Sequence, residues 1–167
     1  MKSKEKILFS KYTNFDEIVI EKASSLGMAL IGGTAIEVWG NYYGLEALRP
    51  RSINDLDFIS ASKEARTEMS KWLKENINPD QVQVDIWNDD PPKLLIKKIG
   101  AILIMSPIHL IWQKLIRGNE RDKGDIKYLL NLVTPEDLEF WLERLGVIDT
   151  EITLINNIIN DIEMENL

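Results

Sequence analysis

Residues 29 to 60 read ALIGGTAIEVWGNYYGLEALRPRSINDLDFIS, and this stretch predicts the centre of the fold. It begins with a short apolar run that ends at Gly32 and Gly33, which is typical of a buried strand entering a turn. It closes with Asp55 and Asp57, which are separated by one residue, on a predicted second strand. Because residues i and i+2 of a strand point to the same face, we expect these two carboxylates to lie side by side.

Two neighbouring carboxylates indicate a cation between them, because close negative charges repel each other and resist joint ionisation. Mg²⁺, or Mn²⁺ in its place, prefers oxygen ligands of this kind and often takes substrate phosphates as further ligands. A glycine pair after a strand also lets the backbone approach phosphates closely. The stretch therefore predicts a site for metal-assisted phosphoryl or nucleotidyl transfer, in which Gly32, Gly33 and Thr34 hold the phosphates.

The rest of the chain predicts an α+β protein, with a small mixed sheet, flanking helices and a C-terminal helical segment. Helices are expected over residues 14–26, 34–43, 62–76, 106–117 and 122–133, and two more begin near 134 and 149. Strands are expected over residues 28–31, 55–59 and 81–87, with a hairpin or two short strands within 94–104. We expect a single domain over residues 1–167, with a core of about 14–105 and a helical part of about 106–167.

Asp85 supplies a third carboxylate. It lies in the alternating segment 81–87, QVQVDIW, on the face opposite the apolar positions, and Trp87 shares that face. If this strand pairs beside the first two carboxylates, the three can hold two metal ions, and Asp85 is then the natural general base. Trp87 could stack on a base. Asp89 and Asp90 compete for the role of Asp85, but they are more typical of solvated acids in a turn.

Composition limits the other possibilities. Cysteine is absent, which excludes disulfides and thiolate metal sites and favours the reducing cytoplasm. No run approaches the ~20 apolar residues of a membrane span, so we expect a soluble, cytoplasmic protein without a membrane partner. The net charge is −7, of which residues 135–167 carry −8 and the remainder +1. The net charge therefore argues against a large nucleic-acid footprint, although it is unevenly spread.

The ordered motifs resemble the nucleotidyltransferase superfamily typified by DNA polymerase β. The shared pattern is a small-residue pair before a helix, a D-x-D on the next strand and a third acid on a later one. The form ALIGGTAIEVWG, with Arg51 four residues before Asp55, is most similar to the AbiEii-like nucleotidyltransferases of toxin–antitoxin and phage-defence systems. Downstream, KLIR from Lys114 and RDKGDI over 121–126 resemble the family's lysine and its R-x-K-D-x-x-D-like helix. The pattern departs at Ile53, where the family often has threonine, and in a longer loop before it.

The resemblance implies an enzyme that moves a nucleoside monophosphate from a nucleoside triphosphate (NTP) to a hydroxyl acceptor. Lys114 would contact the triphosphate or stabilise charge that develops during transfer. Asp125 would orient Lys114 or Arg121, or touch the base or sugar, and Arg51 would join the nucleotide site. The acceptor stays open among a tRNA 3′ end, a protein side chain and a small molecule such as an aminoglycoside. A cognate antitoxin protein is a further expected partner.

Two alternatives stay open for the function. One is a catalytically idle binding module that docks a partner through its acidic C-terminal helices. The other is an antibiotic-modifying nucleotidyltransferase with an acidic pocket for a polycationic drug. At the level of single segments, residues 114–125 also fit a surface helix with ordinary i,i+3 ion pairs. The glycine pair fits a plain strand-to-helix turn, and His109 is more typical of packing than of catalysis.

Overall fold

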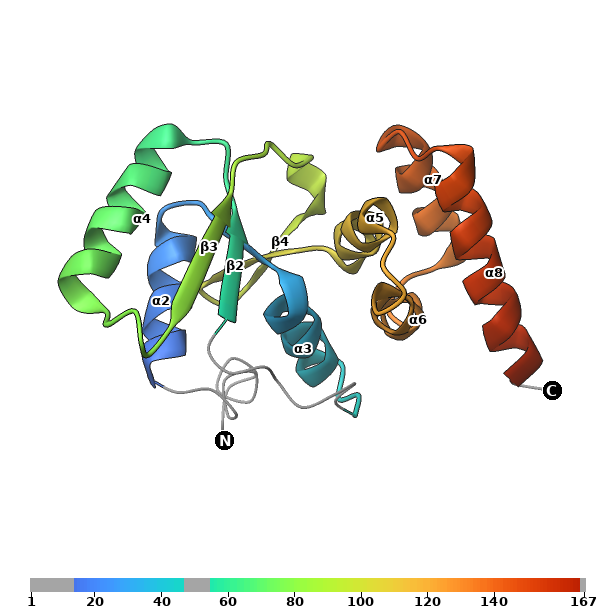
Figure 1. The fold of residues 1–167 in the computed structure, drawn as a ribbon, viewed down its shortest axis with the longest axis horizontal. Coiled ribbons are helices and arrows are strands. Elements are labelled where there is room, and N and C mark those ends of the chain that lie inside the picture. Colours follow the sequence, from blue (N-terminus) through green and yellow to red (C-terminus); the bar gives the residue numbers. More distant parts are fainter. Residues whose placement is uncertain (1–13, 47–54, 166–167) are drawn as a thin grey trace. The chain divides into compact units, whose positions relative to one another are not determined.

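The computed structural model describes residues 14–46 and 55–165, and these form an α+β structure (Figure 1). The chain divides into two compact units, residues 1–105 (unit 1) and residues 106–167 (unit 2). The division falls between Met105 and Ser106.

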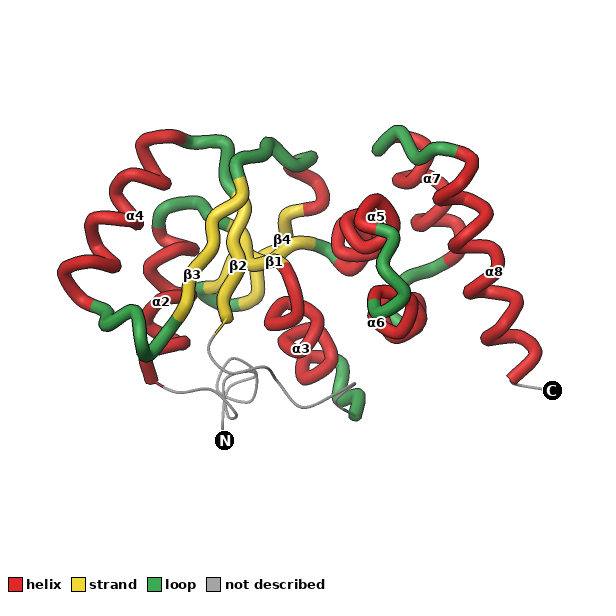
Figure 2. The backbone as a smooth tube through the Cα atoms, viewed as in Figure 1, coloured by secondary structure: helices red, strands yellow, loops and turns green. Residues whose placement is uncertain are grey.

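Within the described residues, unit 1 contains a five-stranded mixed sheet and flanking helices, shown as yellow and red tubes in Figure 2. The helices are α2 (Asn14–Ser25), α3 (Gly32–Tyr42), α4 (Lys63–Asn76) and the short 3-10 helix η1 (Lys93–Leu95). The strands are β1 (Ala29–Ile31), β2 (Asp55–Ile59), β3 (Gln83–Trp87), β4 (Ile96–Ile99) and β5 (Ile102–Met105). Their order across the sheet is β3-β2-β1-β5-β4, so β3 and β4 are the edges.

The strand directions follow from the connections. β2 and β3 are parallel and are joined through α4, because parallel neighbours need a crossover between them. β1 is antiparallel to β2 and parallel to β5. β4 and β5 form an antiparallel hairpin that turns at Gly100, whose φ of +59° suits glycine. The central strands therefore carry both the glycine turn and the carboxylate pair.

The core of unit 1 lies against the sheet. Leu30, Leu56, Phe58 and Ile104 are fully buried. In Figure 1, α2 and α4 lie to the left of β2 and β3, and α3 lies to their right. Two long-range hydrogen bonds hold helices to β5. The indole N–H of Trp39 donates to the Met105 carbonyl at 2.8 Å. The Leu103 N–H donates to Ser24 Oγ at 2.9 Å.

Unit 2 consists of helices α5 (Pro107–Arg117), α6 (Asp122–Leu130), α7 (Pro135–Arg144) and α8 (Asp149–Glu165). The predicted helix starts are confirmed: Ser106 Oγ accepts from the Ile108 N–H, and Thr134 Oγ1 accepts from the Asp137 N–H, both at 3.2 Å. Proline at the first helical position follows each cap. In the two described ranges, no helix is both long and apolar enough to cross a lipid bilayer.

Candidate functional site

The carboxylate face of unit 1 is formed by β2 and β3. Asp57 and Asp85 occupy aligned positions on these parallel strands, which places their Cα atoms about 4.8 Å apart and their side chains on one face. Asp55 precedes Asp57 by two residues and shares this face. Leu56 points the other way and is fully buried, whereas Asp55 and Asp85 are exposed. The register therefore brings the three predicted carboxylates onto one exposed face.

Gly32 lies against the carboxylate of Asp57. Ile31 pairs with Asp57 across β1 and β2, and Gly32 follows at the turn into α3. Its φ of +73° lies in the left-handed region, and a Cβ there would be 2.6 Å from Asp57 Oδ2. A side chain at this position is thus both strained and in collision with the carboxylate. A Cβ at Gly33, by contrast, would have no heavy atom within 4 Å.

The start of α3 faces the same region. The helix begins at Gly32, two residues earlier than predicted, because the left-handed glycine turns the chain directly from strand to helix. The N-cap residue Ile31 makes no side-chain cap hydrogen bond, and backbone N–H groups at a helix start attract anions. Thr34 is buried, and its hydroxyl donates to the Asp55 carbonyl at 3.0 Å. This bond ties the start of α3 to the carboxylate strand.

The three carboxylates suit a hard divalent cation, because they are oxygen ligands and lie on the same face of the sheet. Asp55, Asp57 and Asp85 are the residues that would hold such an ion, because aligned carboxylates repel each other unless a cation lies between them. Their side chains do not converge on one point. Over residues 14–46 and 55–165, no three acidic, histidine or cysteine side chains lie close enough together to hold a metal ion.

Trp87 ends β3 on the carboxylate face, two residues after Asp85, and is 56% exposed. An exposed indole beside charged groups offers a flat surface for stacking. Asp89 and Asp90 follow in the turn and are exposed. Asp89 Oδ1 accepts from the Asp90 N–H at 2.8 Å, so its carboxylate stabilises the turn locally.

The second group of predicted residues lies in unit 2, where an ion cluster joins α5 and α6. Lys114 is buried, with its Nζ 3.1 Å from Asp125 Oδ2 and 3.5 Å from Asp122 Oδ1. Arg117 forms a bidentate pair with Asp122. Its Nε donates to Asp122 Oδ2 at 2.8 Å, and its Nη2 donates to Asp122 Oδ1. Asp122 and Asp125 are 1% and 0% exposed. Two cations of α5 thus neutralise two carboxylates of α6.

The electrostatics of Asp122 reflect this arrangement. Burial by itself raises the pKa of its carboxyl group, because the charged form loses contact with water. The hydrogen bond from Arg117 and the charges of Lys114 and Arg117 outweigh burial and hold the pKa of Asp122 below its usual value. The carboxylate is therefore the stable form.

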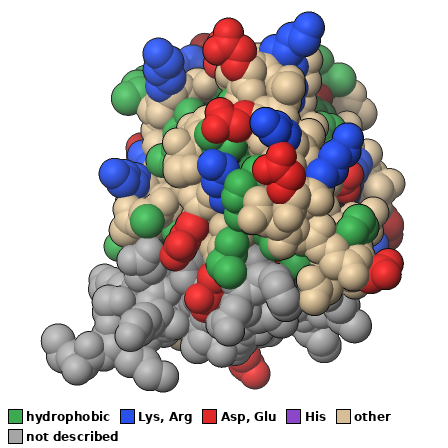
Figure 3. Space-filling model, turned by 90° about the vertical axis from the view of Figure 1, so that its left-hand side faces the viewer, with side chains coloured by type: hydrophobic (Ala, Val, Ile, Leu, Met, Phe, Trp, Pro, Cys, Tyr) green, Lys and Arg blue, Asp and Glu red, His purple; other side chains and the backbone are tan. Residues whose placement is uncertain are grey.

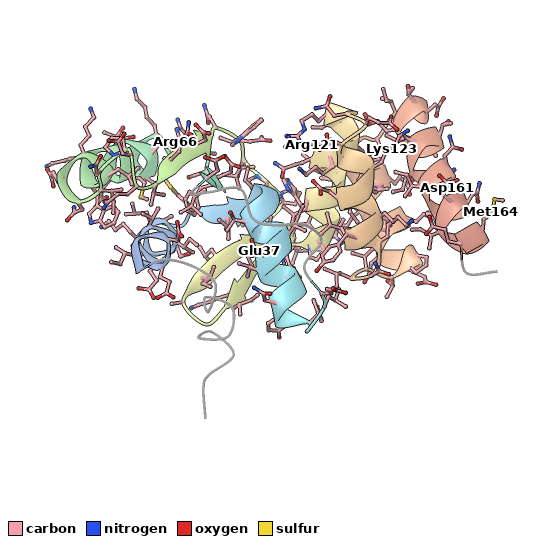
Figure 4. The ribbon with its side chains drawn as sticks, turned by 60° about the horizontal axis from the view of Figure 1, so that its bottom comes forward. Glu37, Arg66, Arg121, Lys123, Asp161 and Met164 are labelled. Carbon is pink, nitrogen blue, oxygen red and sulfur yellow. The ribbon has the colours of Figure 1, made fainter. Side chains whose placement is uncertain are left out.

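The structure decides between several alternatives for this segment. An ordinary surface helix is wrong for Lys114, Asp122 and Asp125, because all three are buried. Asp125 contacts Lys114, one of the contacts predicted for it, while Arg121 is exposed (Figure 4). His109 is 1% exposed, and its ring lies 5.2 Å from that of Trp112, as expected for a packing role.

Two predictions are not tested by the structure. Arg51 lies outside the described residues. A contact of Lys114 with a triphosphate stays a prediction, since the lysine belongs to unit 2 and the carboxylate face to unit 1.

Sequence reasoning missed two contributors. One is Asp122, for which the signal is that Lys114 and Arg117 lie on one helix and carboxylates follow at 122 and 125. The other is Arg66. It donates to the Ser60 carbonyl at 2.9 Å and to Asn88 Oδ1 at 3.0 Å, so it ties α4 to the residues directly after β2 and β3.

Comparisons with known proteins add no family. No protein-family model matches the chain, and no curated protein matches it.

Proposed function

We propose that the chain is a metal-dependent nucleotidyltransferase that uses the carboxylate face of unit 1. The observation that carries this proposal is the aligned pair Asp57 and Asp85, with the Gly32 backbone packed against the Asp57 carboxylate. A like-charged pair on adjacent strands opposes folding, so a sequence that keeps it is expected to use it. Transfer of a phosphorus group to a hydroxyl is the chemistry that such an arrangement supports best.

Each residue of the face has a role in this proposal. Asp55, Asp57 and Asp85 would hold Mg²⁺, which when bound neutralises phosphate charge and lowers the pKa of the attacking hydroxyl. The acceptor oxygen bonds to the α-phosphorus, and the bond between that phosphorus and the β-bridging oxygen breaks. Pyrophosphate carries away the bonding electrons. Asp85 is exposed on the edge strand, where its carboxylate is accessible to take the acceptor's proton.

The start of α3 would hold the phosphates of the NTP. Backbone N–H groups at a helix start favour anions, and a Cβ at Gly33 would have no heavy atom within 4 Å, which leaves room for a phosphate. Thr34 supports this role by fixing the helix start to β2 through its hydrogen bond with Asp55. Trp87 would stack on a nucleobase from the same face.

The proposed role of Lys114 is more limited. Its ammonium is already shared between Asp122 and Asp125, so any contact with a triphosphate has to compete with two buried carboxylates. Asp125 would then set the position of Lys114. Other parts of the proposal rest on the resemblance alone. These are the acceptor, the NTP and a toxin–antitoxin system with a cognate antitoxin.

Labelling tests the proposal without knowledge of the acceptor. The protein is incubated with each α-³²P-labelled NTP, Mg²⁺ and a total extract of RNA, proteins and small molecules, and the labelled fraction is identified. We expect label in one fraction for the wild type and for Asp90→Asn, and none for Asp57→Asn or Asp85→Asn. Label that persists in both carboxylate variants contradicts the assignment. If none of the four proteins transfers label although all of them are folded, the result favours the idle binding module.

A further inference from the structure

The outer surface of α4 carries a segregated set of charges. Lys63, Arg66, Thr67, Ser70, Lys71 and Lys74 line a shallow hollow of about 420 Å³. At 3.6 residues per turn, these six positions share one face of the helix. Glu64, Glu68 and Glu75 fall on the adjacent stripe, and the buried Ala65 and Met69 fall on the inner side. The hollow therefore contains four cations and no acid.

These cations are available for a ligand. Lys63, Lys71 and Lys74 are exposed, and no ion pair among the described residues involves a residue of α4. Arg66 is held by its two hydrogen bonds, to Ser60 and Asn88, both from one nitrogen. The guanidinium is thus fixed in place with donors to spare. Figure 4 shows Arg66 on α4, and Figure 3 views this side of unit 1, with Lys and Arg side chains spread across its upper part among scattered acids.

The lining identifies the class of partner. Apolar anchors, on which protein partners depend for most of their binding energy, are missing from the six lining residues. Lysine, arginine, serine and threonine are the side chains that contact phosphate oxygens in nucleic-acid complexes. Lys63 and Lys74 are eleven residues apart, and a helix of that length spans roughly 16 Å, enough for several consecutive phosphates.

We propose that this cationic face of α4 binds the phosphodiester backbone of a nucleic acid. The proposal rests on the α4 contacts and not on the carboxylate face, so it stands or falls separately from nucleotidyl transfer. The net charge of −7 does not reveal this face, because residues 135–167 carry a net charge of −8 while the face is local to unit 1. Binding without sequence preference is expected, since backbone contacts carry no base information.

Salt dependence gives the sharpest test. Binding of a fluorescein-labelled 20-nucleotide single-stranded RNA is followed by anisotropy between 50 and 200 mM KCl, with EDTA present and no NTP. Four neutralised phosphates predict an affinity loss of about 50-fold over this range for a single strand. The variant Lys63→Gln/Lys71→Gln/Lys74→Gln leaves Arg66 as the one cation of the hollow and should bind more weakly than the wild type. Its affinity should fall by only about 3-fold between 50 and 200 mM KCl.

A charge-matched control uses exposed lysines elsewhere in unit 1. The variant Lys93→Gln/Lys97→Gln/Lys98→Gln removes the same charge and should keep the wild-type affinity and salt dependence. Duplex RNA and single-stranded DNA arms distinguish the kind of nucleic acid, and circular dichroism checks that each variant is folded. Three results overturn the proposal: no wild-type binding at 50 mM KCl, equal losses in the two triple variants, or equal competition by polyglutamate.

Discussion

Asp57 and Asp85 are aligned on neighbouring parallel strands, while Leu56 and Val84 beside them are aligned on the opposite face. The apolar pair favours the pairing of β2 with β3, and the carboxylate pair opposes it. Gly32 adds a second constraint, since its backbone occupies the space next to the Asp57 carboxylate. The arrangement places two like charges opposite each other on neighbouring strands.

Replacing Asp85 with asparagine should stabilise unit 1 when no divalent cation is present. The substitution removes the like charge opposite Asp57 at an exposed position, so the expected gain is small, about 0.2–1 kcal/mol and nearer the lower value. Urea unfolding in EDTA measures it. Asp90→Asn, an exposed acid in the next turn, is the control and should leave the free energy of unfolding unchanged. A destabilised Asp85→Asn would show that the carboxylate has a structural role instead.

Alanine at the two glycines should have opposite effects. Gly32→Ala introduces a side chain at φ +73° and 2.6 Å from Asp57 Oδ2, so we expect a loss of at least about 1–2 kcal/mol and a displaced carboxylate. Gly33→Ala points into open space within α3 and should stabilise by up to about 1 kcal/mol. Thermal unfolding and the labelling assay together measure both variants. Equal stability of the two would contradict the close packing of Gly32 on Asp57.

The ion cluster of unit 2 should be important for stability. Asp122→Asn removes a buried carboxylate from Lys114, which keeps Asp125, and from Arg117, whose side chain is 44% exposed. The expected loss is therefore about 1.5–3 kcal/mol, below the cost of breaking a fully buried pair. Glu120→Gln is the matched control, because Glu120 is 86% exposed and its pair with Lys123 is worth less than about 1 kcal/mol. Urea unfolding of both variants at pH 7 compares them. Similar losses would mean that the cluster contributes no more than a surface pair.

The same cluster predicts a dependence on pH. The pKa of Asp122 is lowered in the folded protein, so its stabilising contribution is complete above the unfolded value of about 3.9. That contribution is lost as the pH falls through the folded pKa. The wild type should therefore lose stability more steeply below pH 4 than Asp122→Asn does. Parallel acid-unfolding curves for the two proteins would refute the assignment of the lowered pKa to Asp122.

Trp87 should matter for nucleotide binding and little for folding. It is 56% exposed, so Trp87→Leu is expected to change the free energy of unfolding by less than about 0.5 kcal/mol. Loss of base stacking costs about 1–3 kcal/mol, or roughly 5- to 150-fold in affinity. Calorimetric titration with an NTP analogue and Mg²⁺ measures the difference. Unchanged affinity would remove Trp87 from the site.

Local pattern was sufficient for much of unit 1 and for the helix starts of unit 2. The period of two in 81–87 placed Asp85 and Trp87 on the exposed face, and serine or threonine before proline predicted the starts of α5 and α7. These features depend on residues close in sequence, which periodicity and capping describe well.

Long-range relationships were beyond the pattern. Nothing in the sequence sets the register of Asp57 with Asp85, since that depends on how β2 and β3 pair after α4 crosses between them. The burial of Lys114 could not be predicted either, because a lysine on a helix is ordinarily exposed and its burial depends on tertiary packing. The cationic face of α4 follows from the spacing of its charged residues, which the apolar pattern of residues 62–76 does not describe.

Metal binding at the carboxylate face tests the central claim most directly. The signal of free Mn²⁺ in electron paramagnetic resonance is measured while protein is added, in the presence of a non-hydrolysable NTP analogue. The four proteins are the wild type, Asp57→Asn, Asp85→Asn and Asp90→Asn. Wild type and Asp90→Asn should bind with equal affinity, and the other two variants should bind at least about 10-fold more weakly, because loss of even an outer-shell partner costs that much. Equal Mn²⁺ binding by all four folded proteins, or binding by none, would contradict the account.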